Sequence, residues 1–339
     1  MNPVKIRVDG VSKVFGKDPG AALARVEAGM DKARLLEETD HVLGLHGITL
    51  DIRAGETFVI MGLSGSGKST LIRHFNRLID PTGGRILFDG EDILAYDEPR
   101  LRAFRRRKVA MVFQRFALLP HRTVIENVMY GLTLDGVPKA KARARAGAQI
   151  ALVGLSGFES SYPAQLSGGM QQRVGLARAL ATDAEVLLMD EAFSALDPLI
   201  RHDMQMQLKE LRGSLGKTIV FITHDLDEAL LLGDHIAILK DGMLRQVGTG
   251  DEILRAPADD YVARFVRDVN RARILSCGAC ADAGLALPPD APQIAAGAPL
   301  ESAFGFFAGG AGAVAVRDAE GRIAGGLTPQ KLLEALARA

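Results

Sequence analysis

The sequence predicts an α/β protein built on a sheet of mostly parallel strands, and two observations lead to this fold class. Short apolar runs recur without polar alternation at residues 57–61, 109–113, 186–189, 218–222 and 236–239. Uninterrupted runs of this length are typical of strands that are covered on both faces by helices. In addition, the first run leads directly into a glycine-rich loop and then a predicted helix, which is the order of elements in a parallel α/β sheet.

The N-terminal region predicts antiparallel strands separated by an insert. Residues 5–15 show the apolar and polar alternation of such a strand, and strand character resumes at 47–52. Residues 17–46 differ in texture, because apolar side chains recur at near-helical spacing within Ala21–Glu38. We therefore expect one or two inserted amphipathic helices. A further strand is expected at 85–90, where it ends in a turn.

Shifts in composition predict three parts. Residues 1–270 hold the sheet, together with a helical lobe at about 115–182. Residues 271–300 include an alanine- and proline-rich stretch, as linkers often do. Residues 301–339 predict a small α/β element, because a turn signal separates two short strands and Thr328-Pro329 begins a closing helix.

Composition narrows the classes of function. The 339 residues carry 41 Lys and Arg against 41 Asp and Glu, so the net charge of zero argues against nucleic acid as the main partner. The one basic cluster, residues 102–108, is expected to be a solvated helix face. We expect no secretory signal and no membrane-spanning segment. Cys277 and Cys280 supply at most half a zinc site and are expected to be reduced thiols.

The glycine-rich loop predicts a phosphate-binding site. It consists of Gly62, Leu63, Ser64, Gly65, Ser66, Gly67, Lys68, Ser69 and Thr70. Glycines allow successive backbone N–H groups to converge on one anion, and the N-terminus of the following helix adds partial positive charge. Lys68 can reach the β- and γ-phosphates, and the Ser69 hydroxyl can bind Mg²⁺. A simple turn with a solvated lysine is the alternative, which the flanking strand and helix disfavour.

Side chains at the ends of other strands extend this site. Asp190 ends the run 186–189 and is expected to serve Mg²⁺ beside Ser69, while Glu191 is expected to orient or deprotonate the attacking water. His224 ends the run 218–222 and is expected to assist at the γ-phosphate. Two more residues complete the predicted site: Gln114 as a ligand of Mg²⁺ or water, and Phe15 as a stacking partner of adenine, with core packing as its alternative.

A second anion-binding loop precedes another helix. Ser167, Gly168 and Gly169 stand before the predicted helix 171–181, where backbone N–H groups and the helix dipole favour an anion. Neither a lysine nor a pair of acids follows this loop. Two phosphate-binding loops with only one metal-and-water apparatus predict a homodimer, in which each nucleotide lies between the Lys68 loop of one chain and the Ser167 loop of the other.

Together these motifs resemble the ATP-binding subunit of an ABC transporter. The set covers most of residues 1–250 in the order Gly62–Thr70, Gln114, Leu166–Met170, Val186–Glu191, Ser194–Asp197 and His224. The resemblance implies a P-loop NTPase cassette with a mixed sheet core, an antiparallel β subdomain and a helical lobe. It also implies that Asp197 contacts the opposing subunit, that Gln114 couples nucleotide state to a membrane partner, and that the cofactors are ATP and Mg²⁺.

A closer resemblance is to the ATPases of glycine betaine and proline importers. The insert after Phe15, the segment Phe116–His121 and the segment Met189–Arg201 carry it. It implies uptake of a quaternary-amine osmolyte, such as betaine, choline, proline betaine or trimethylamine N-oxide. The implied partners are transmembrane permease subunits and, indirectly, a periplasmic or lipid-anchored binding protein. The implied location is peripheral, at the cytoplasmic face of the inner membrane.

Members of that group often end in tandem CBS domains that sense conditions. Residues 313–336 resemble the second half of one CBS unit, and the tail is too short for two. Two chains each supplying one unit, and a vestigial element without sensing, are both compatible with this length. Two other functions remain as alternatives to transport, namely a soluble ABC ATPase and a P-loop kinase.

Overall fold

The largest sheet gathers the apolar runs in one layer. The computed structural model describes residues 2–113, 117–194, 196–267 and 269–337. Within them this sheet has six strands in the order β10-β9-β3-β8-β7-β6, parallel except for β10. Their bounds are β3 (Thr57–Met61), β6 (Val109–Val112), β7 (Val186–Asp190), β8 (Thr218–Thr223), β9 (His235–Lys240) and β10 (Met243–Gly248). The expectation of a mostly parallel, mixed sheet is confirmed.

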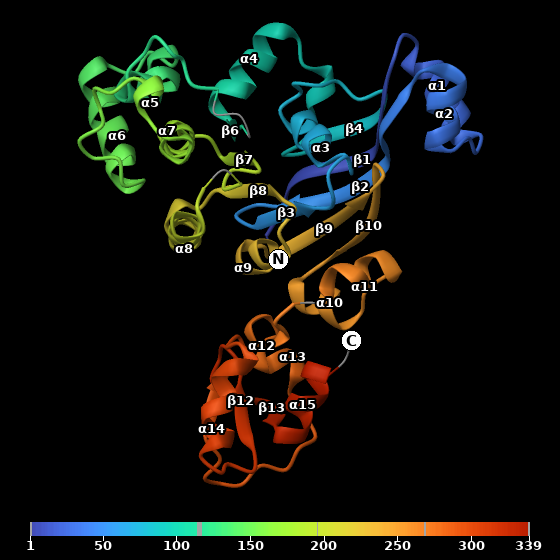
Figure 1. Ribbon diagram of the computed structural model, residues 1–339, viewed down its shortest axis with the longest axis vertical. Coiled ribbons are helices and arrows are strands. Elements are labelled where there is room, and N and C mark those ends of the chain that lie inside the picture. Colours follow the sequence, from blue (N-terminus) through green and yellow to red (C-terminus); the bar gives the residue numbers. More distant parts are fainter. Residues whose placement is uncertain (1, 114–116, 195, 268, 338–339) are drawn as a thin grey trace.

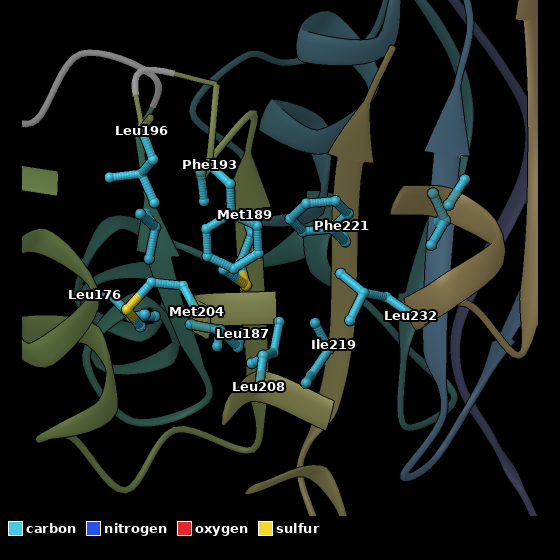
Figure 2. Close-up of a cluster of buried hydrophobic side chains, with 14 of the residues drawn as sticks. Leu176, Leu187, Met189, Phe193, Leu196, Met204, Leu208, Ile219, Phe221 and Leu232 are labelled. Carbon is cyan, nitrogen blue, oxygen red and sulfur yellow. The ribbon is translucent and has the colours of Figure 1, made fainter. Parts of the chain in front are cut away.

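Both faces of this sheet are covered, which explains the lack of polar alternation. Ile219 and Phe221 of β8 face one core, whereas Val220 and Ile222 face another. Figure 2 shows the first core, where side chains from β7 and β8 meet those of helices α7 (Gly168–Leu180), α8 (Pro198–Leu215) and α9 (Leu226–Leu232). The second core is filled from α3 (Lys68–Phe75), α4 (Glu98–Arg107) and a second sheet.

The second sheet is antiparallel and carries the insert. Among the described residues its strand order is β2-β1-β4-β5, with β1 (Val4–Phe15), β2 (Val42–Arg53), β4 (Gly83–Phe88) and β5 (Glu91–Asp92). The 3₁₀ helix η1 (Ile93–Ala95) follows. Between β1 and β2 stand α1 (Pro19–Glu27) and α2 (Lys32–Thr39), seen at the upper right of Figure 1. The two expected helices are therefore present, although β2 starts at Val42, inside the predicted insert.

The insert packs on a small core of its own. This core consists of Val14, Ala22, Leu23, Val26, Leu35 and Leu43. Asp18 and Asp31 accept hydrogen bonds from backbone N–H groups in the first turns of α1 and α2, so each short helix has a defined start. The insert is thus held against the ends of β1 and β2 independently of the two large cores.

The helical lobe follows β6, as the sequence predicts. It contains α5 (Val124–Leu134), α6 (Lys139–Leu152), the 3₁₀ helix η2 (Pro163–Gln165) and α7. Thr123 and Glu126 form a capping box at the start of α5. Small side chains of α6, Ala142 and Ala146, are fully buried and allow close packing of this helix on the rest of the lobe. The basic helix α4 lies outside the lobe and has Leu101 and Phe104 on its buried side.

The C-terminal part, residues 271–337, forms a module below the core (Figure 1). Two connecting helices, α10 (Gly250–Arg255) and α11 (Asp260–Val266), lead into it. Its elements are α12 (Arg271–Ile274), α13 (Cys277–Cys280), β11 (Gln293–Ala295), η3 (Leu300–Ala303), α14 (Phe304–Ala308), β12 (Val314–Arg317), β13 (Ile323–Leu327) and α15 (Pro329–Ala337). In the described chain its sheet has the order β11-β12-β13, with β11 parallel and β13 antiparallel to β12.

This module corrects the expectation of a linker at 271–300. That segment contributes β11 to the sheet, and it includes α12 and α13. Leu275, Cys277 and Leu300 are almost fully buried, in the same hydrophobic cluster as Ile253 and Leu254 of α10. These scattered apolar side chains anchor the alanine- and proline-rich stretch to the core. Its composition alone therefore wrongly indicated a linker. The predicted hairpin and closing helix are present, and Thr328 accepts a hydrogen bond from the Lys331 N–H.

Two expectations from composition can be compared with the described residues. None of their helices is both long enough and apolar enough to span a bilayer. Cys277 and Cys280 are not joined by a disulfide. Burial raises the pKa of the Cys277 thiol to about 11, so this thiol stays protonated at neutral pH.

Candidate nucleotide-binding site

The glycine-rich loop lies at the carboxyl end of the parallel sheet. It joins the end of β3 to the start of α3, and Met61 stands in register with Thr223 at the end of β8. Gly67 has a φ of 99°, a left-handed conformation that favours glycine, and a side chain there would come within 2.7 Å of the Gly44 carbonyl oxygen. The local structure therefore requires glycine at this position, directly before the helix.

Lys68 is held inside the loop. Its side chain is only 5% exposed, and Nζ donates hydrogen bonds to the carbonyl oxygens of Gly62 at 2.7 Å and Leu63 at 3.0 Å. Burial lowers the pKa of this amine, with the nearby carboxylates of Glu191 and Asp190 acting in the opposite direction. A buried ammonium group whose hydrogen bonds within the described residues go only to backbone carbonyls suits an anionic ligand.

Asp190 and Ser69 meet as the sequence predicts. The Ser69 hydroxyl donates to Asp190 Oδ1 at 2.8 Å, and Arg73 Nη2 lies 3.6 Å from Oδ2. Asp190 is fully buried, and burial raises the pKa of its carboxyl. Oδ2 is buried and accepts no hydrogen bond from the described residues. A hydroxyl beside a carboxylate with spare acceptor capacity fits Mg²⁺, which uses few protein ligands alongside phosphate oxygens.

Glu191 and His224 stand next to this pair. Glu191 has a φ of 48°, and its carbonyl oxygen accepts hydrogen bonds from Ser194 Oγ at 2.9 Å and Gln172 Nε2 at 3.3 Å. A left-handed conformation is unusual for a residue other than glycine, and such backbone strain is often found at functional sites. His224 Nδ1 lies 3.6 Å from Glu191 Oε1, and its side chain is 60% exposed. A carboxylate and an imidazole so placed can accept and relay a proton from a water molecule.

A cavity of about 590 Å³ connects these groups with the antiparallel sheet and the insert. The loop residues 63–70, Glu191 and His224 line one part, and Phe15 lines another. Phe15 stands opposite Val42 in the β1–β2 register and is 40% exposed. Because it faces a cavity rather than a core, the structure is compatible with the predicted stacking role.

The sequence missed several residues of this wall. Lys32 on α2 and the β2 residues Val42, Leu43 and Gly44 also line the cavity. The predicted insert at residues 17–46 could have pointed to them. Because the chain returns from the insert beside Phe15, residues at its end also approach the ligand that Phe15 is expected to contact. Without the β1–β2 register this could not be derived.

The remaining predicted residues do not join the cavity within one chain. Ser167 is exposed and caps α7 by accepting from the Met170 N–H at 3.3 Å, and Gly168 is also exposed. Asp197 caps α8 by accepting from the Ile200 N–H at 3.1 Å. Ser167, Gly168, Gly169 and Asp197 are absent from the residues that line the cavity. Gln114 lies outside the described residues, so its predicted role stays a prediction.

Sequence comparisons place this site among known proteins. Residues 45–194 match a family model described as ABC transporter. The chain is 55% identical over 276 residues to the glycine betaine transport ATP-binding protein of Bacillus subtilis, covering 81% of this chain and 66% of that protein. It is 49% identical over 280 residues to the trimethylamine N-oxide transport system ATP-binding protein of Ruegeria pomeroyi, covering 83% of this chain and 82% of that one.

Solved structures agree with the sequence comparisons. A dimeric bacterial ABC transporter cassette matches with a TM-score of 0.63 and 33% identity, covering 72% of this chain and 98% of that one. A dimeric post-hydrolysis state of the same cassette, bound to ADP and phosphate, matches with a TM-score of 0.62. The similarity thus extends over the ATPase core of the fold.

Proposed function

Because this chain belongs to the family of ABC transporter ATP-binding subunits, we propose that its ATPase activity powers the uptake of a quaternary-amine osmolyte or a related trimethylated compound. Its cofactors are ATP and Mg²⁺, as in other cassettes of the family. The enzyme class is established by the family, whereas the transported compound is our proposal.

The similarity to two kinds of transport subunit carries the choice of substrate. Relatives named for glycine betaine and for trimethylamine N-oxide both align over about four fifths of this chain. Both named compounds carry a nitrogen atom with three methyl groups. The chain spans about two thirds of the length of the glycine betaine relative and about four fifths of the other.

We assign the parts of the reaction to residues that line the cavity and to Asp190, which is hydrogen-bonded to one of them. Lys68 and the loop backbone hold the phosphates, while Ser69 and Asp190 hold Mg²⁺. Glu191 activates the attacking water and His224 assists it. Phe15 stacks on the adenine. In a homodimer, Ser167, Gly168, Gly169 and Asp197 of the other copy complete the pocket, since they lie outside the cavity of their own chain.

We propose that two permease subunits provide the pore and that this subunit docks on them peripherally, at the cytoplasmic face of the inner membrane. A periplasmic or lipid-anchored binding protein would deliver the substrate to the permease. Residues 301–339 are proposed as a partial CBS-like regulatory element, which β11 of the preceding segment joins in one sheet. The three-stranded sheet and closing helix of the module support a folded unit, and its shared cluster with α10 supports communication with the ATPase core.

Uptake in a strain lacking this subunit tests the proposal. Radiolabelled betaine, choline, proline betaine and trimethylamine N-oxide are supplied separately to cells complemented with wild-type protein or with Lys68→Ala. Accumulation of one of these compounds is expected only with the wild-type protein. Equal accumulation of all four with and without the subunit would contradict the proposed substrate class, while leaving the ATPase assignment unaffected.

A further inference from the structure

A second polar cavity lies where the C-terminal module meets the ATPase core. Its volume is about 260 Å³. Arg255, the last residue of α10, contributes from the core, whereas Arg271 and Lys331 contribute from α12 and α15 of the module. Leu275 and Ala335 form apolar parts of the wall. Any molecule in this cavity would therefore touch both parts of the chain.

Arg271 is the unusual member of this wall. It is only 9% exposed, yet its side chain makes no hydrogen bond or ion pair with any residue that the structure describes. Arg273, two residues further along, is 70% exposed and lies 3.4 Å from Glu301. The nitrogens of Arg271 are not among the fully enclosed polar atoms of the described residues, so they keep some solvent contact, while no protein acceptor replaces the water that burial of the side chain removes. An arginine buried in this way at a cavity is expected to have a ligand.

Positive charge exceeds negative charge around the cavity. Three cationic side chains line the cavity with one carboxylate, that of Glu334, and Asp282, which does not line it, lies near Lys331. Lys331 Nζ is 3.9 Å from Glu334 and 3.8 Å from Asp282, both beyond hydrogen-bonding distance. Among the described residues Arg255 makes one side-chain hydrogen bond, from Nη1 to the Ala279 carbonyl oxygen at 2.8 Å. Donors on all three side chains thus remain for an acceptor-rich molecule.

We propose that this cavity binds a small oxyanion, phosphate or a phosphomonoester, that bridges α10 of the core and α15 of the module. The planar guanidinium of Arg271 offers paired N–H donors that match the spacing of oxygens on such a group. Arg255 and Lys331 supply the remaining charge. Bound in this position, the anion fastens the module to the connecting helices that lead out of the ATPase core.

Calorimetric titration of the full-length protein with inorganic phosphate and, separately, with glycerol 3-phosphate tests this site. Lys68→Ala serves as the parent, so that phosphate binding at the nucleotide loop is weakened. Adding Arg271→Gln is expected to weaken anion binding on the order of 10-fold or more, as for a lost charged hydrogen bond. Adding Arg273→Gln, on the same helix but outside the cavity, is expected to leave binding unchanged. Binding of only one of the two probes identifies the source of the anion.

A milder variant guards against a folding defect at Arg271. Lys331 is 45% exposed, so Lys331→Gln is expected to keep the fold, checked by circular dichroism, and to weaken binding several-fold. Saturable phosphate binding that survives unchanged in both the Arg271→Gln and the Lys331→Gln proteins would overturn the proposal. So would a Lys68→Ala parent that binds neither probe at millimolar concentration.

Discussion

The Lys68 loop and the Ser167 loop are both glycine-containing segments that lead into a helix, yet their surroundings differ. Around the first, one chain gathers a buried cation, a serine hydrogen-bonded to a buried aspartate, and a glutamate near a histidine. Around the second, Ser167 and Gly168 are exposed, and neither residue lines the cavity. This contrast is what a pocket completed by a second chain would produce, and it supports the proposed homodimer.

The largest expected effect separates ATP hydrolysis from ATP binding at the site of the Lys68 loop. Glu191→Gln removes the proposed base while keeping the size of the side chain. Turnover is expected to fall by about 10²- to 10⁴-fold, as for a lost general base, while ATP still binds and holds the dimer. Steady-state phosphate release and gel filtration with ATP measure the two properties.

A control for this variant comes from the opposite end of the same strand. Glu185 precedes β7 and pairs with Lys5 and Lys108 far from the cavity, so Glu185→Gln is expected to keep normal turnover. If Glu191→Gln hydrolyses ATP at the wild-type rate, Glu191 is not the base.

The next largest effect concerns the affinity of the Lys68 loop for the phosphates of ATP. Lys68→Ala is expected to weaken MgATP binding on the order of 10- to 100-fold, because it removes charged hydrogen bonds in a buried loop. Fluorescence titration with a labelled nucleotide gives the affinity. Lys108→Ala, which removes a partly exposed lysine from the other end of the sheet, serves as the control. Unchanged affinity in the Lys68 variant would show that another group holds the phosphates.

Mixing two inactive variants compares the loops directly. Lys68→Ala inactivates one loop and Ser167→Arg the other, so each protein alone has two damaged pockets. In a mixed dimer, one pocket pairs an intact Lys68 loop with an intact Ser167 loop. Equal mixing is expected to restore about a quarter of wild-type turnover, since about half of the dimers are mixed and each has one intact pocket.

The same mixture also has a clear negative outcome. Turnover no greater than the mean of the two separate variants, with mixed dimers verified by tagged purification, would mean that both loops act within one chain. Since Ser167 also caps α7, the Ser167→Arg protein is expected to lose about 1 kcal/mol of stability, which thermal unfolding would detect.

The smallest expected effect concerns the pH dependence of stability and comes from the helix that follows the Lys68 loop. His74 on α3 is fully buried, with Nδ1 2.6 Å from the Thr70 carbonyl oxygen, and burial lowers its pKa to about 4. The unfolded chain, with a pKa near 6.5, then binds more protons below that pH, so stability falls as pH drops from 6.5 towards 4. Between pH 7 and pH 5.5 the wild type is expected to lose about 1 kcal/mol that His74→Gln retains.

Urea unfolding at both pH values measures this difference. Comparing the two proteins cancels the contributions of other titrating groups that the substitution leaves in place. An identical pH dependence in both proteins would show that His74 does not titrate in this window.

Much of the site was predictable because parallel strands end at a common edge. Lys68, Asp190 and His224 each follow an apolar run, so the parallel order of the strands is enough to predict that they lie near one another. The hydrogen bond between Ser69 and Asp190 agrees with this prediction. The nucleobase side was not predictable to the same extent, because Lys32 and Val42 reach the cavity through a strand register interrupted by bulges.

The C-terminal module could be predicted only in part, because only its local features leave a pattern in the sequence. Its hairpin and closing helix followed from local turn and cap signals, which act over a few residues. The parallel pairing of β11 with β12 connects segments about twenty residues apart, and its short strand has no clear pattern. Arg271 carried no signal in the sequence at all, since only packing decides whether an arginine is solvated or enclosed.

The small separate core of the insert has a consequence for nucleotide preference. Leu35 and Leu43 belong to that core, while Lys32 and Val42, each within three residues of them, face the cavity near Phe15. The wall opposite the phosphates is therefore anchored without help from the catalytic sheet. Substitutions that loosen this anchor would alter discrimination between purine and pyrimidine triphosphates, while the rate of bond cleavage in the bound state stays the same.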